Sequence, residues 1–363
     1  MKQTRIIFVG GFLGAGKTTL IWNVAQRLIK RGRHVGLITN DQAPELVDTV
    51  WLQQQGLKVA EVSGSCFCCN FNGLADAIRK VGADAVADVI IAEPVGSCTD
   101  LSATILQPLK QNRKADLQVA PLSVLADPVR LISILEGETA ALHIDAAYIF
   151  RKQLEESDII LITKADTLEP EAVQALIDRT SKAFPFATVL PISAATGEGV
   201  DAWLEEVMKR NEAGLRIVEV DYDIYAHGEA VLGWLNGTVQ LKGDNVDWNI
   251  FTKDLLADLG NRFDSAGYGV GHVKAILESG DSFIIGNLTG KGDTLSVRGS
   301  VIPADTAKLT INARVETDKE ELDAIIREAL EDATHNRYES RIVAWRCLQP
   351  GRPNPTYRFA QVV

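Results

Sequence analysis

Short apolar runs alternate with amphipathic stretches along residues 5–192. The apolar runs predict strands at Arg5–Val9, Arg33–Thr39, Leu57–Val62, Asp88–Ala92, Leu117–Leu125, Ile159–Thr163 and Thr188–Ile192. Apolar residues recur at helical spacing after Lys17, over Ala146–Glu156 and over Glu169–Ala183. Strands that alternate with helices indicate an α/β fold, with a doubly wound, mainly parallel sheet covered on both faces. Ligands of such sheets bind beyond the carboxyl ends of the strands, so the residues that follow the strands are the first candidates for function.

A polar stretch at Lys209–Leu215 separates this pattern from a second one and is the expected linker. Beyond it we expect strands at Ile217–Tyr225, Val231–Leu241, Val270–Leu277, Phe283–Leu288, Leu295–Val297, Leu309–Val315 and Arg341–Leu348. Helices are expected over Trp248–Leu259 and after Thr317, which forms a capping box with Glu320. This order favours a smaller α+β, ferredoxin-like domain. We therefore expect a first domain over 1–210, a second over 217–349, and a Pro-rich tail over 350–363 without an assigned role.

Composition narrows the class of partner. The 363 residues carry a formal net charge of −11, which argues against nucleic acid as the main partner. No apolar run reaches the roughly 18 residues of a membrane span, so we expect no membrane partner. The N-terminus runs directly into the first expected strand, from which we expect a cytoplasmic protein.

The stretch after the first strand matches a phosphate-binding loop. Gly11, Gly16, Lys17 and Thr18 have the spacing G-x-x-x-x-G-K-[ST], between an expected strand and an expected helix. Glycines let backbone N–H groups point at a phosphate, and the helix dipole adds partial positive charge. The predicted phosphate cradle consists of Gly11, Gly14, Ala15, Gly16, Lys17, Thr18 and Thr19. Lys17 is the candidate catalytic group at the β- and γ-phosphates, and the Thr18 hydroxyl is a candidate Mg²⁺ ligand.

Two further strand ends carry candidate groups for the same chemistry. Glu93 follows the strand Val89–Ile91, where a carboxylate can orient water bound to Mg²⁺. Gly96 can offer its N–H to a γ-phosphate. Asp41, at the end of the second strand, is a candidate to bind Mg²⁺ or to orient the attacking water, although a simple turn aspartate has the same pattern.

The ends of the last two strands of this domain favour guanine over adenine. Thr163-Lys164-Ala165-Asp166 resembles the [NT]-K-x-D motif of GTPases. A carboxylate at Asp166 can accept both donors on one edge of guanine, which adenine does not present. Ser193 and Ala194 resemble the short motif whose alanine N–H meets guanine O6. Thr163, Lys164, Asp166, Ser193 and Ala194 therefore predict GTP as the nucleotide.

Three of the five cysteines, Cys66, Cys68 and Cys69, fall within four positions after the third strand. Thiolates at this spacing in a turn can converge on one soft or borderline ion, and the alternative is a thiol cluster without metal. Cys98, two residues after Gly96, is expected near the same region, and Cys347 is expected to pack in the second domain. In the second half of the chain the candidate contacts to metal or partner are His227, His272 and Lys274, with a structural role as the alternative.

Taken together, these motifs resemble the CobW-like family of P-loop GTPases, relatives of the hydrogenase- and urease-maturation GTPases. The resemblance rests on residues 10–19, Cys66-Phe67-Cys68-Cys69, Glu93-x-x-Gly96, Thr163-Lys164-x-Asp166 and Ser193-Ala194. It implies a nucleotide-gated metallochaperone that binds zinc, cobalt or nickel through the matched cysteines, zinc foremost. The chain departs from the family at Asn40-Asp41-Gln42-Ala43 and at Ser65, and it contains no His-rich tract.

The main hypothesis is a GTPase, slow when isolated, that delivers a metal or metallocofactor to a client enzyme. The alternative is a regulatory G-protein that gates the loading of a corrinoid (cobalamin) cofactor onto an enzyme, with structural cysteines. A small-molecule kinase is disfavoured by the guanine motif. The metal, the client and the oligomeric state, with a homodimer among the options, stay open at this stage.

Overall fold

The structure, a computed structural model, describes residues 3–41, 47–85, 87–111, 117–139, 142–289 and 295–363. Contacts between residues divide the chain into two compact units. The first unit comprises Met1–Gln42, Leu52–Gly228 and Arg352–Val363, and the second comprises Ala43–Trp51 and Glu229–Gly351. The division therefore falls at 228/229 rather than at the expected linker over 209–215. A segment before α2 and part of this helix group with the second unit, whereas most of the expected tail groups with the first.

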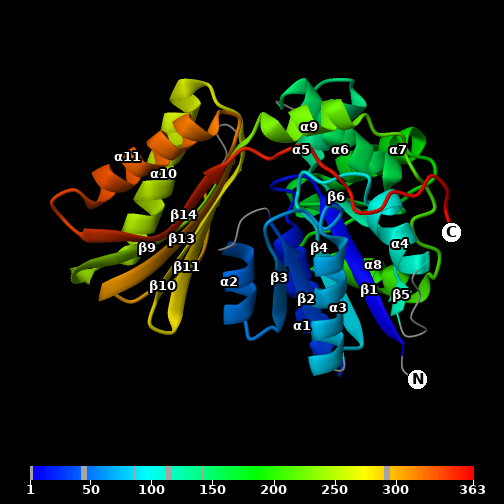
Figure 1. Cartoon of the computed structure of the whole chain (residues 1–363), viewed down its shortest axis with the longest axis horizontal. Helices are drawn as coiled ribbons and strands as arrows, with labels where there is room; N and C mark the ends of the chain where they lie inside the picture. The colour runs from blue at the N-terminus through cyan, green and yellow to red at the C-terminus, as the bar shows by residue number, and fades with distance from the viewer. Residues whose placement is uncertain (1–2, 42–46, 86, 112–116, 140–141, 290–294) are drawn as a thin grey trace. The chain divides into compact units, whose positions relative to one another are not determined.

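The first unit contains an eight-stranded sheet with the path β3-β2-β4-β1-β6-β7-β8, and β5 pairs with β1 (Figure 1). The pairings in this sheet are parallel. Its strands are β1 (Thr4–Gly11), β2 (Val35–Asn40), β3 (Val59–Val62), β4 (Val89–Glu93), β5 (Leu117–Val119), β6 (Ser123–Ala126), β7 (Ile159–Ile162) and β8 (Thr188–Pro191). Its helices are α1 (Lys17–Lys30), α3 (Phe71–Ala85), α4 (Gln107–Gln111), α5 (Pro128–Leu135), α6 (Ile144–Glu156), α7 (Pro170–Ala183), α8 (Val200–Lys209) and most of α9 (Tyr222–Ala230).

Burial and strand order together locate the functional edge of this sheet. Strands β4 and β7 are buried at every position, which requires cover on both faces. Strand β1 lies between β4 and β6, so the strand order reverses on its two sides and leaves a crevice at its carboxyl end. The predicted α/β class is confirmed, and the loops after β1, β2 and β4 meet at one edge of the sheet.

One predicted strand of this part of the chain is divided into two, and another is wrong. The run Leu117–Leu125 is broken into β5 and β6 because Pro121 lacks the N–H that a central strand must donate. The alternating run Ile217–Tyr225 forms no strand, and its end belongs to α9. The backbone just before it bonds to side chains instead of to a sheet: the N–H groups of Gly214 and Leu215 donate to Asp158 at 2.6 and 3.0 Å.

The second unit contains a six-stranded sheet with the order β12-β11-β10-β13-β9-β14. Its elements are β9 (Gly233–Val246), α10 (Trp248–Ala266), β10 (Val270–Ser279), β11 (Ser282–Leu288), β12 (Ser296–Ser300), β13 (Ala304–Val315), α11 (Lys319–Thr334) and β14 (Glu339–Leu348). Without the β11–β12 extension, four antiparallel strands and two helices follow the order β-α-β-β-α-β. This is the predicted ferredoxin-like arrangement. Both helices lie on the same face of the sheet (Figure 1) and cover its apolar core.

The cap of α11 differs from the expectation by one residue. Asp318, rather than Thr317, is the N-cap, and its carboxylate accepts the Glu321 N–H at 2.7 Å. An aspartate at this position also interacts favourably with the positive end of the helix.

The sheet of the second unit also anchors the first turn of α2 (Val47–Gln54). The Val47 N–H donates to Asn312 Oδ1 at 2.7 Å, and Lys274 Nζ contacts Asp48 Oδ2 at 2.6 Å. Lys274 and Asn312 are directly opposite each other on β10 and β13. Because strand residues alternate between faces, these two point away from the face on which Val273 joins the helix-covered core.

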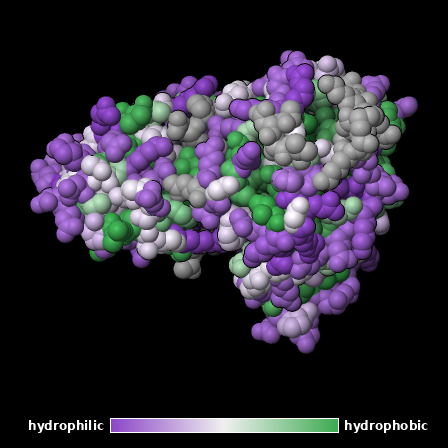
Figure 2. Space-filling view, turned by 90° about the horizontal axis from the view of Figure 1, so that it is seen from below, coloured by the Kyte–Doolittle hydropathy of each residue, from purple (hydrophilic) through white to green (hydrophobic). Residues whose placement is uncertain are grey.

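Surface hydropathy and helix composition can be compared with the expectation that the chain has no membrane partner. Figure 2 shows a face on which hydrophilic residues predominate. Among the residues that the structure describes, no helix combines the length and the apolar character that crossing a membrane requires.

Candidate functional site

The turn between β1 and α1 has the backbone of an anion cradle. Gly14 and Gly16 have positive φ values of 77° and 93°, which few side chains tolerate. Gly16 is the N-cap of α1, and as a glycine it has no side chain that could cap this helix end. Gly11 also has a positive φ of 130°, and a Cβ there would lie 2.6 Å from the Leu125 carbonyl oxygen. The predicted cradle, which includes Ala15 and Thr19, thus places a glycine-rich turn at the positive end of α1, where an anion is favoured.

Three predicted groups converge beside this cradle. The Thr18 hydroxyl donates to the two carboxylate oxygens of Glu93 at 3.3 and 3.4 Å. A buried hydroxyl and a buried carboxylate side by side form an oxygen donor set that suits Mg²⁺. Lys17 Nζ donates to the carbonyls of Gly11 and Phe12 at 2.7 and 3.2 Å. A Cβ on Gly96 would lie 3.0 Å from this Nζ, so the loop after β4 approaches the lysine closely.

The guanine-type motifs lie on two adjacent loops. The Ala165 N–H donates to the Ile192 carbonyl at 3.1 Å, which places the loop of Thr163, Lys164 and Asp166 beside that of Ser193 and Ala194. Lys164 has a left-handed backbone with φ 52° and an ion pair to Asp127 at 2.7 Å. Asp166 is exposed, so its carboxylate is accessible to a base. On α1, Asn23 Nδ2 donates to the Ala194 carbonyl at 3.3 Å and ties these loops to the helix of the phosphate cradle.

The cysteine loop follows β3 and is a tight turn. The N–H groups of Cys69 and Asn70 donate to the Cys66 carbonyl at 3.1 and 2.9 Å, which turns all three thiols to one side. The Cys66 and Cys68 sulfurs lie 2.9 Å apart, and those of Cys68 and Cys69 lie 3.8 Å apart. Sulfur ligands of tetrahedral zinc, at about 2.3 Å from the ion, are about 3.8 Å from one another. The trio therefore fits zinc after a small opening of the first pair.

Cys98 is a fourth thiol at this cluster. Hydrogen bonds from Cys68, and to a lesser extent from Cys69 and Cys98, lower the pKa of Cys66 well below its ordinary value. The bond with Cys66 raises the pKa of Cys68, and it raises the pKa of Cys69 to about 11. One thiol thus ionises readily and holds the protons of its neighbours close by. A metal ion that recruits all three must displace those protons, so binding releases them.

Asn40 joins the end of β2 to the cysteine loop. Its Nδ2 donates to the carbonyls of Val62 and Ser65 at 2.8 and 2.9 Å, and its Oδ1 accepts the Phe67 N–H at 2.7 Å. The next residue along the chain is Asp41, which is buried at the same strand end. Gln42 and Ala43, which also distinguish this chain from the family pattern, lie outside the described residues. Asp41, the candidate to bind Mg²⁺ or to orient the attacking water, is thus adjacent to the residue that holds the cysteine loop.

Comparison with known proteins decides the family. The sequence model of the CobW/HypB/UreG nucleotide-binding domain matches residues 5–191. The chain belongs to the CobW/HypB/UreG family. The zinc chaperone YeiR of Escherichia coli (strain K12) is 32% identical over 185 residues, which are 48% of this chain and 50% of that protein. The chain thus spans about half of the length of this curated relative.

Two solved structures are also similar to the chain, at low scores. HypB from Helicobacter pylori in complex with nickel is 16% identical, with a TM-score of 0.42, over 58% of this chain and 90% of that one. Zn(II)-bound YjiA GTPase from E. coli is 16% identical, with a TM-score of 0.34, over 92% of this chain and 100% of that one. Scores this low do not bear on the site, and the assignment to the CobW/HypB/UreG family rests on the sequence match.

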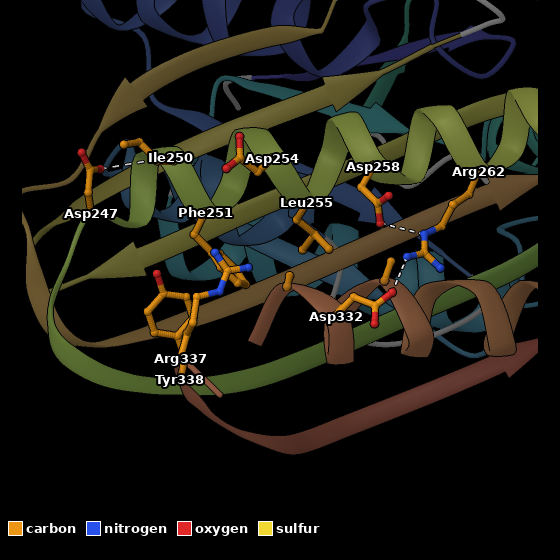
Figure 3. Close-up of a pocket in the computed structure, with 12 residues that line it drawn as sticks. Asp247, Ile250, Phe251, Asp254, Leu255, Asp258, Arg262, Asp332, Arg337 and Tyr338 are labelled. Atoms are coloured by element: carbon orange, nitrogen blue, oxygen red, sulfur yellow. Dashed lines mark hydrogen bonds and ion pairs between the residues drawn. The ribbon is translucent and has the colours of Figure 1, made fainter. Parts of the chain in front are cut away.

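Residues of the second unit divide into separate environments. Lys274 is paired with Asp48, and His272 is buried on β10. Cys347 Sγ donates to the Lys319 carbonyl at 3.1 Å. A groove of about 400 Å³ lies between α10 and α11, where Arg262 bridges Asp258 and Asp332 (Figure 3). Among the residues that line this groove none belongs to the nucleotide or cysteine motifs of the CobW/HypB/UreG family.

Several residues at the site were not predicted from the sequence. Gln153 on α6 donates to the carbonyls of Gly96 and Cys98 at 2.9 and 2.8 Å and so holds the loop after β4. Arg130 donates to the Leu13 carbonyl of the phosphate cradle at 2.5 Å. In the tail, the Asn354 N–H donates to Cys69 Sγ at 3.2 Å, and Thr356 donates to the carbonyls of Cys68 and Cys69 at 2.8 and 3.1 Å. These contacts join distant parts of the chain, and no local pattern predicts them.

Proposed function

We propose that this chain is a GTP-dependent metallochaperone of the cytoplasm, which holds Zn²⁺ at Cys66, Cys68 and Cys69 and delivers it to a client metalloenzyme. Membership of the CobW/HypB/UreG family supports the GTPase, and the name of the E. coli relative, a zinc chaperone, supports the metal. A set of three cysteines also favours zinc over harder ions.

The observation that carries the proposal is the direct contact between the nucleotide loops and the cysteine loop. Asn40, next to Asp41, holds the backbone of the cysteine loop through three hydrogen bonds. Cys98, two residues beyond Gly96, hydrogen-bonds to the thiols of Cys66 and Cys68. A change at either nucleotide loop therefore moves a group that touches the metal ligands.

The chemistry assigned to each residue follows from its place. The N–H groups at the start of α1 bind phosphate, and Lys17 leaves its carbonyl partners to neutralise the β- and γ-phosphates. Thr18 and Glu93 would hold Mg²⁺, which neutralises charge on the phosphates when bound. Loss of the γ-phosphate releases the loops of Asp41 and Gly96. By linkage, the affinity for metal and the affinity for nucleotide change by the same factor.

The decisive experiment titrates Zn²⁺ into the protein bound to a non-hydrolysable GTP analogue and into the protein bound to GDP. We expect the two dissociation constants to differ by about 5- to 150-fold, the usual range of coupled sites. Replacing Cys66, Cys68 and Cys69 with Ser should abolish the difference, and Cys347→Ser, in the second unit, is the matched control. Identical affinities in the two nucleotide states would sink the proposal. Co²⁺ and Ni²⁺ in the same titration rank the metals.

Asn40→Ala tests the contact itself. Because Asn40 contacts the cysteine loop through its side chain, its removal should bring the two affinities together while Thr18, Glu93 and the three thiols stay in place. A variant that retains the full nucleotide dependence would show that the coupling runs elsewhere.

Asp166→Asn tests the choice of base. An amide at this position cannot accept both guanine donors but can pair with the edge of xanthine. We expect GTP binding to weaken and xanthosine triphosphate binding to strengthen, measured by competition with a fluorescent nucleotide. An unchanged ratio of the two affinities would remove Asp166 from the site.

A further inference from the structure

A second group of metal-ligand side chains lies apart from the cysteine loop, on α6 and α9. His143 is the N-cap of α6, Asp145 is in its first turn, and His227 is in the last turn of α9. One ligand atom from each lies within 4.8 Å of the others. The His143 and Asp145 atoms Nδ1 and Oδ2 are 3.8 Å apart, and His227 Nδ1 contacts the same Oδ2 directly. The two imidazole rings lie edge to face, and their centroids are 5.1 Å apart.

Close packing of the α6 and α9 backbones brings these three residues together. A Cβ on Gly228 would lie 2.4 Å from the Asp145 carbonyl oxygen, so α9 packs this closely on α6 only because residue 228 is glycine. At the other end of α9, the Asp221 N–H donates to the Tyr148 hydroxyl on α6 at 2.8 Å. The two helices are thus fastened on either side of His227, and its ring is held over the first turn of α6.

We propose that His143, Asp145 and His227 form a second binding site for a divalent transition metal of the zinc class. Two imidazole nitrogens and one carboxylate are a ligand set of catalytic and exchangeable zinc sites, which leave a fourth position open. Metal–ligand bonds of about 2.0–2.2 Å place tetrahedral ligand atoms about 3.4 Å apart. The three groups reach this spacing by small side-chain rotations, because their side chains are 39%, 23% and 60% exposed.

The competing description is a plain hydrogen-bonded pair of His227 and Asp145 beside a capping histidine. His143 Nδ1 accepts the Asp145 N–H at 3.2 Å, and metal binding through this atom replaces that cap bond. The positive end of α6 opposes a cation, whereas the negative end of α9 beside His227 favours one. The bonds from the metal to its three ligands must therefore outweigh the lost cap bond and the unfavourable end of α6.

This site differs from the cysteine trio in chemistry and goes beyond the proposed function. Nitrogen and carboxylate ligands bind borderline ions without the preference for soft ions that three thiolates confer. His227 also lies directly before Gly228, where the first unit ends. A metal ion here fastens the start of the connection to α6, whatever nucleotide is bound.

Co²⁺ spectroscopy separates the two sites. In the variant with Ser at 66, 68 and 69, we expect one remaining equivalent of Co²⁺ with visible d–d bands and without the near-ultraviolet thiolate charge-transfer band. Adding His227→Ala or Asp145→Asn should abolish binding of this equivalent or lower its Co²⁺ affinity. Loss of a residue that only positions a ligand lowers affinity by about 10- to 100-fold, and we expect a larger loss here. His34→Ala is the matched control, because His34 faces one carboxylate, Asp88 at 3.5 Å, and is in no three-ligand group among the described residues.

The same variants in the background with intact cysteines guard against a failure to fold. There His227→Ala should lower the metal stoichiometry by one equivalent and leave the thiolate band unchanged, with circular dichroism as the check on folding. The inference is overturned if the cysteine-free protein binds no Co²⁺, or if the equivalent that it binds survives both His227→Ala and Asp145→Asn. Neither result depends on the nucleotide, so the proposed function stands or falls separately.

Discussion

At the scale of single residues, the loop after β4 is held by buried charge. Asp100, in a left-handed conformation with φ 63°, accepts bonds from the Tyr222 hydroxyl and the Arg358 guanidinium at 2.7 Å each. Glu156 accepts the Thr99 hydroxyl and the Ser102 N–H, both at 2.9 Å. Burial, with a smaller contribution from the charge of Asp100, raises the pKa of Glu156 to about 8. Glu156 is therefore protonated at neutral pH and keeps one negative charge out of the interior.

Glu156→Gln tests this state, since an amide imitates the protonated acid. In the wild type the unfolded chain ionises Glu156 near its ordinary pKa while the folded protein does not, so stability falls as the pH rises from about 4.5 to about 8 and is constant above. We expect the variant to match the wild type near pH 4.5 and to be more stable above pH 8, by at most about 5 kcal/mol. Urea unfolding at both pH values measures the difference in the free energy of unfolding between the variant and the wild type.

Glu155→Gln is the matched control for Glu156→Gln. Glu155 is the neighbour in sequence, but it forms surface ion pairs with Arg151 and Lys152. Such pairs contribute about 0–1 kcal/mol, and no pH-dependent gain is expected. A pH-dependent gain as large as that of Glu156→Gln would refute the buried, protonated state.

At the scale of elements, the sequence predicted well those features that depend on neighbouring residues. The strands of the first sheet are continuous apolar runs, and the phosphate loop is a fixed spacing of neighbours, so each could be predicted from adjacent residues. The failures have tertiary causes. The run Ile217–Tyr225 alternates as a strand does, yet its neighbour Gly214 finds its hydrogen-bond partner in Asp158 rather than in a strand. The roles of the individual site residues stay predictions.

The tail is the largest element whose place could not be predicted. The Asn354 N–H contacts the cysteine loop across 285 positions of sequence, and this backbone group is present in nearly every residue type. The Thr356 hydroxyl donates to the Cys69 carbonyl and accepts the Phe71 N–H at 3.4 Å, so it holds the end of the cysteine loop to the start of α3. Tyr357 adds an edge-to-face contact with Phe71. The tail therefore positions the loop that carries the proposed metal ligands.

Thr356→Val removes the hydroxyl and keeps the shape of the side chain. Because groups that position metal ligands usually contribute about 10- to 100-fold in affinity, we expect Zn²⁺ to bind more weakly by about tenfold or more. A chelator competition measures it. The control is Arg352→Ala, in the same tail, whose ion pair with Asp223 is exposed and should contribute nothing to metal binding. Equal Zn²⁺ affinities of Thr356→Val and the control would contradict the positioning role.

At the scale of the whole molecule, one short segment near α2 lies within the sequence of the first unit but groups by its contacts with the second unit. Asp41 belongs to the first unit, and a few residues later Ala43–Trp51 groups with the second. The first turn of α2 is fastened there by the Asp48–Lys274 pair and by Asn312. Asp41 of the first unit therefore lies shortly before this anchored helical turn in the sequence.

Lys274→Met tests the anchor. The side chains of Asp48 and Lys274 are only 10% and 17% exposed, so loss of one partner leaves a largely buried charge, at a cost of about 3–5 kcal/mol when burial is complete. We expect faster hydrogen exchange in Val47–Gln54 and a smaller difference in Zn²⁺ affinity between the two nucleotide states. Lys242→Met is the control, because its pair with Glu339 is 61% and 77% exposed and contributes about 0–1 kcal/mol. Because the substitution touches neither the phosphate cradle nor a thiol, unchanged exchange together with an unchanged affinity ratio would mean that the anchor plays no part in the coupling.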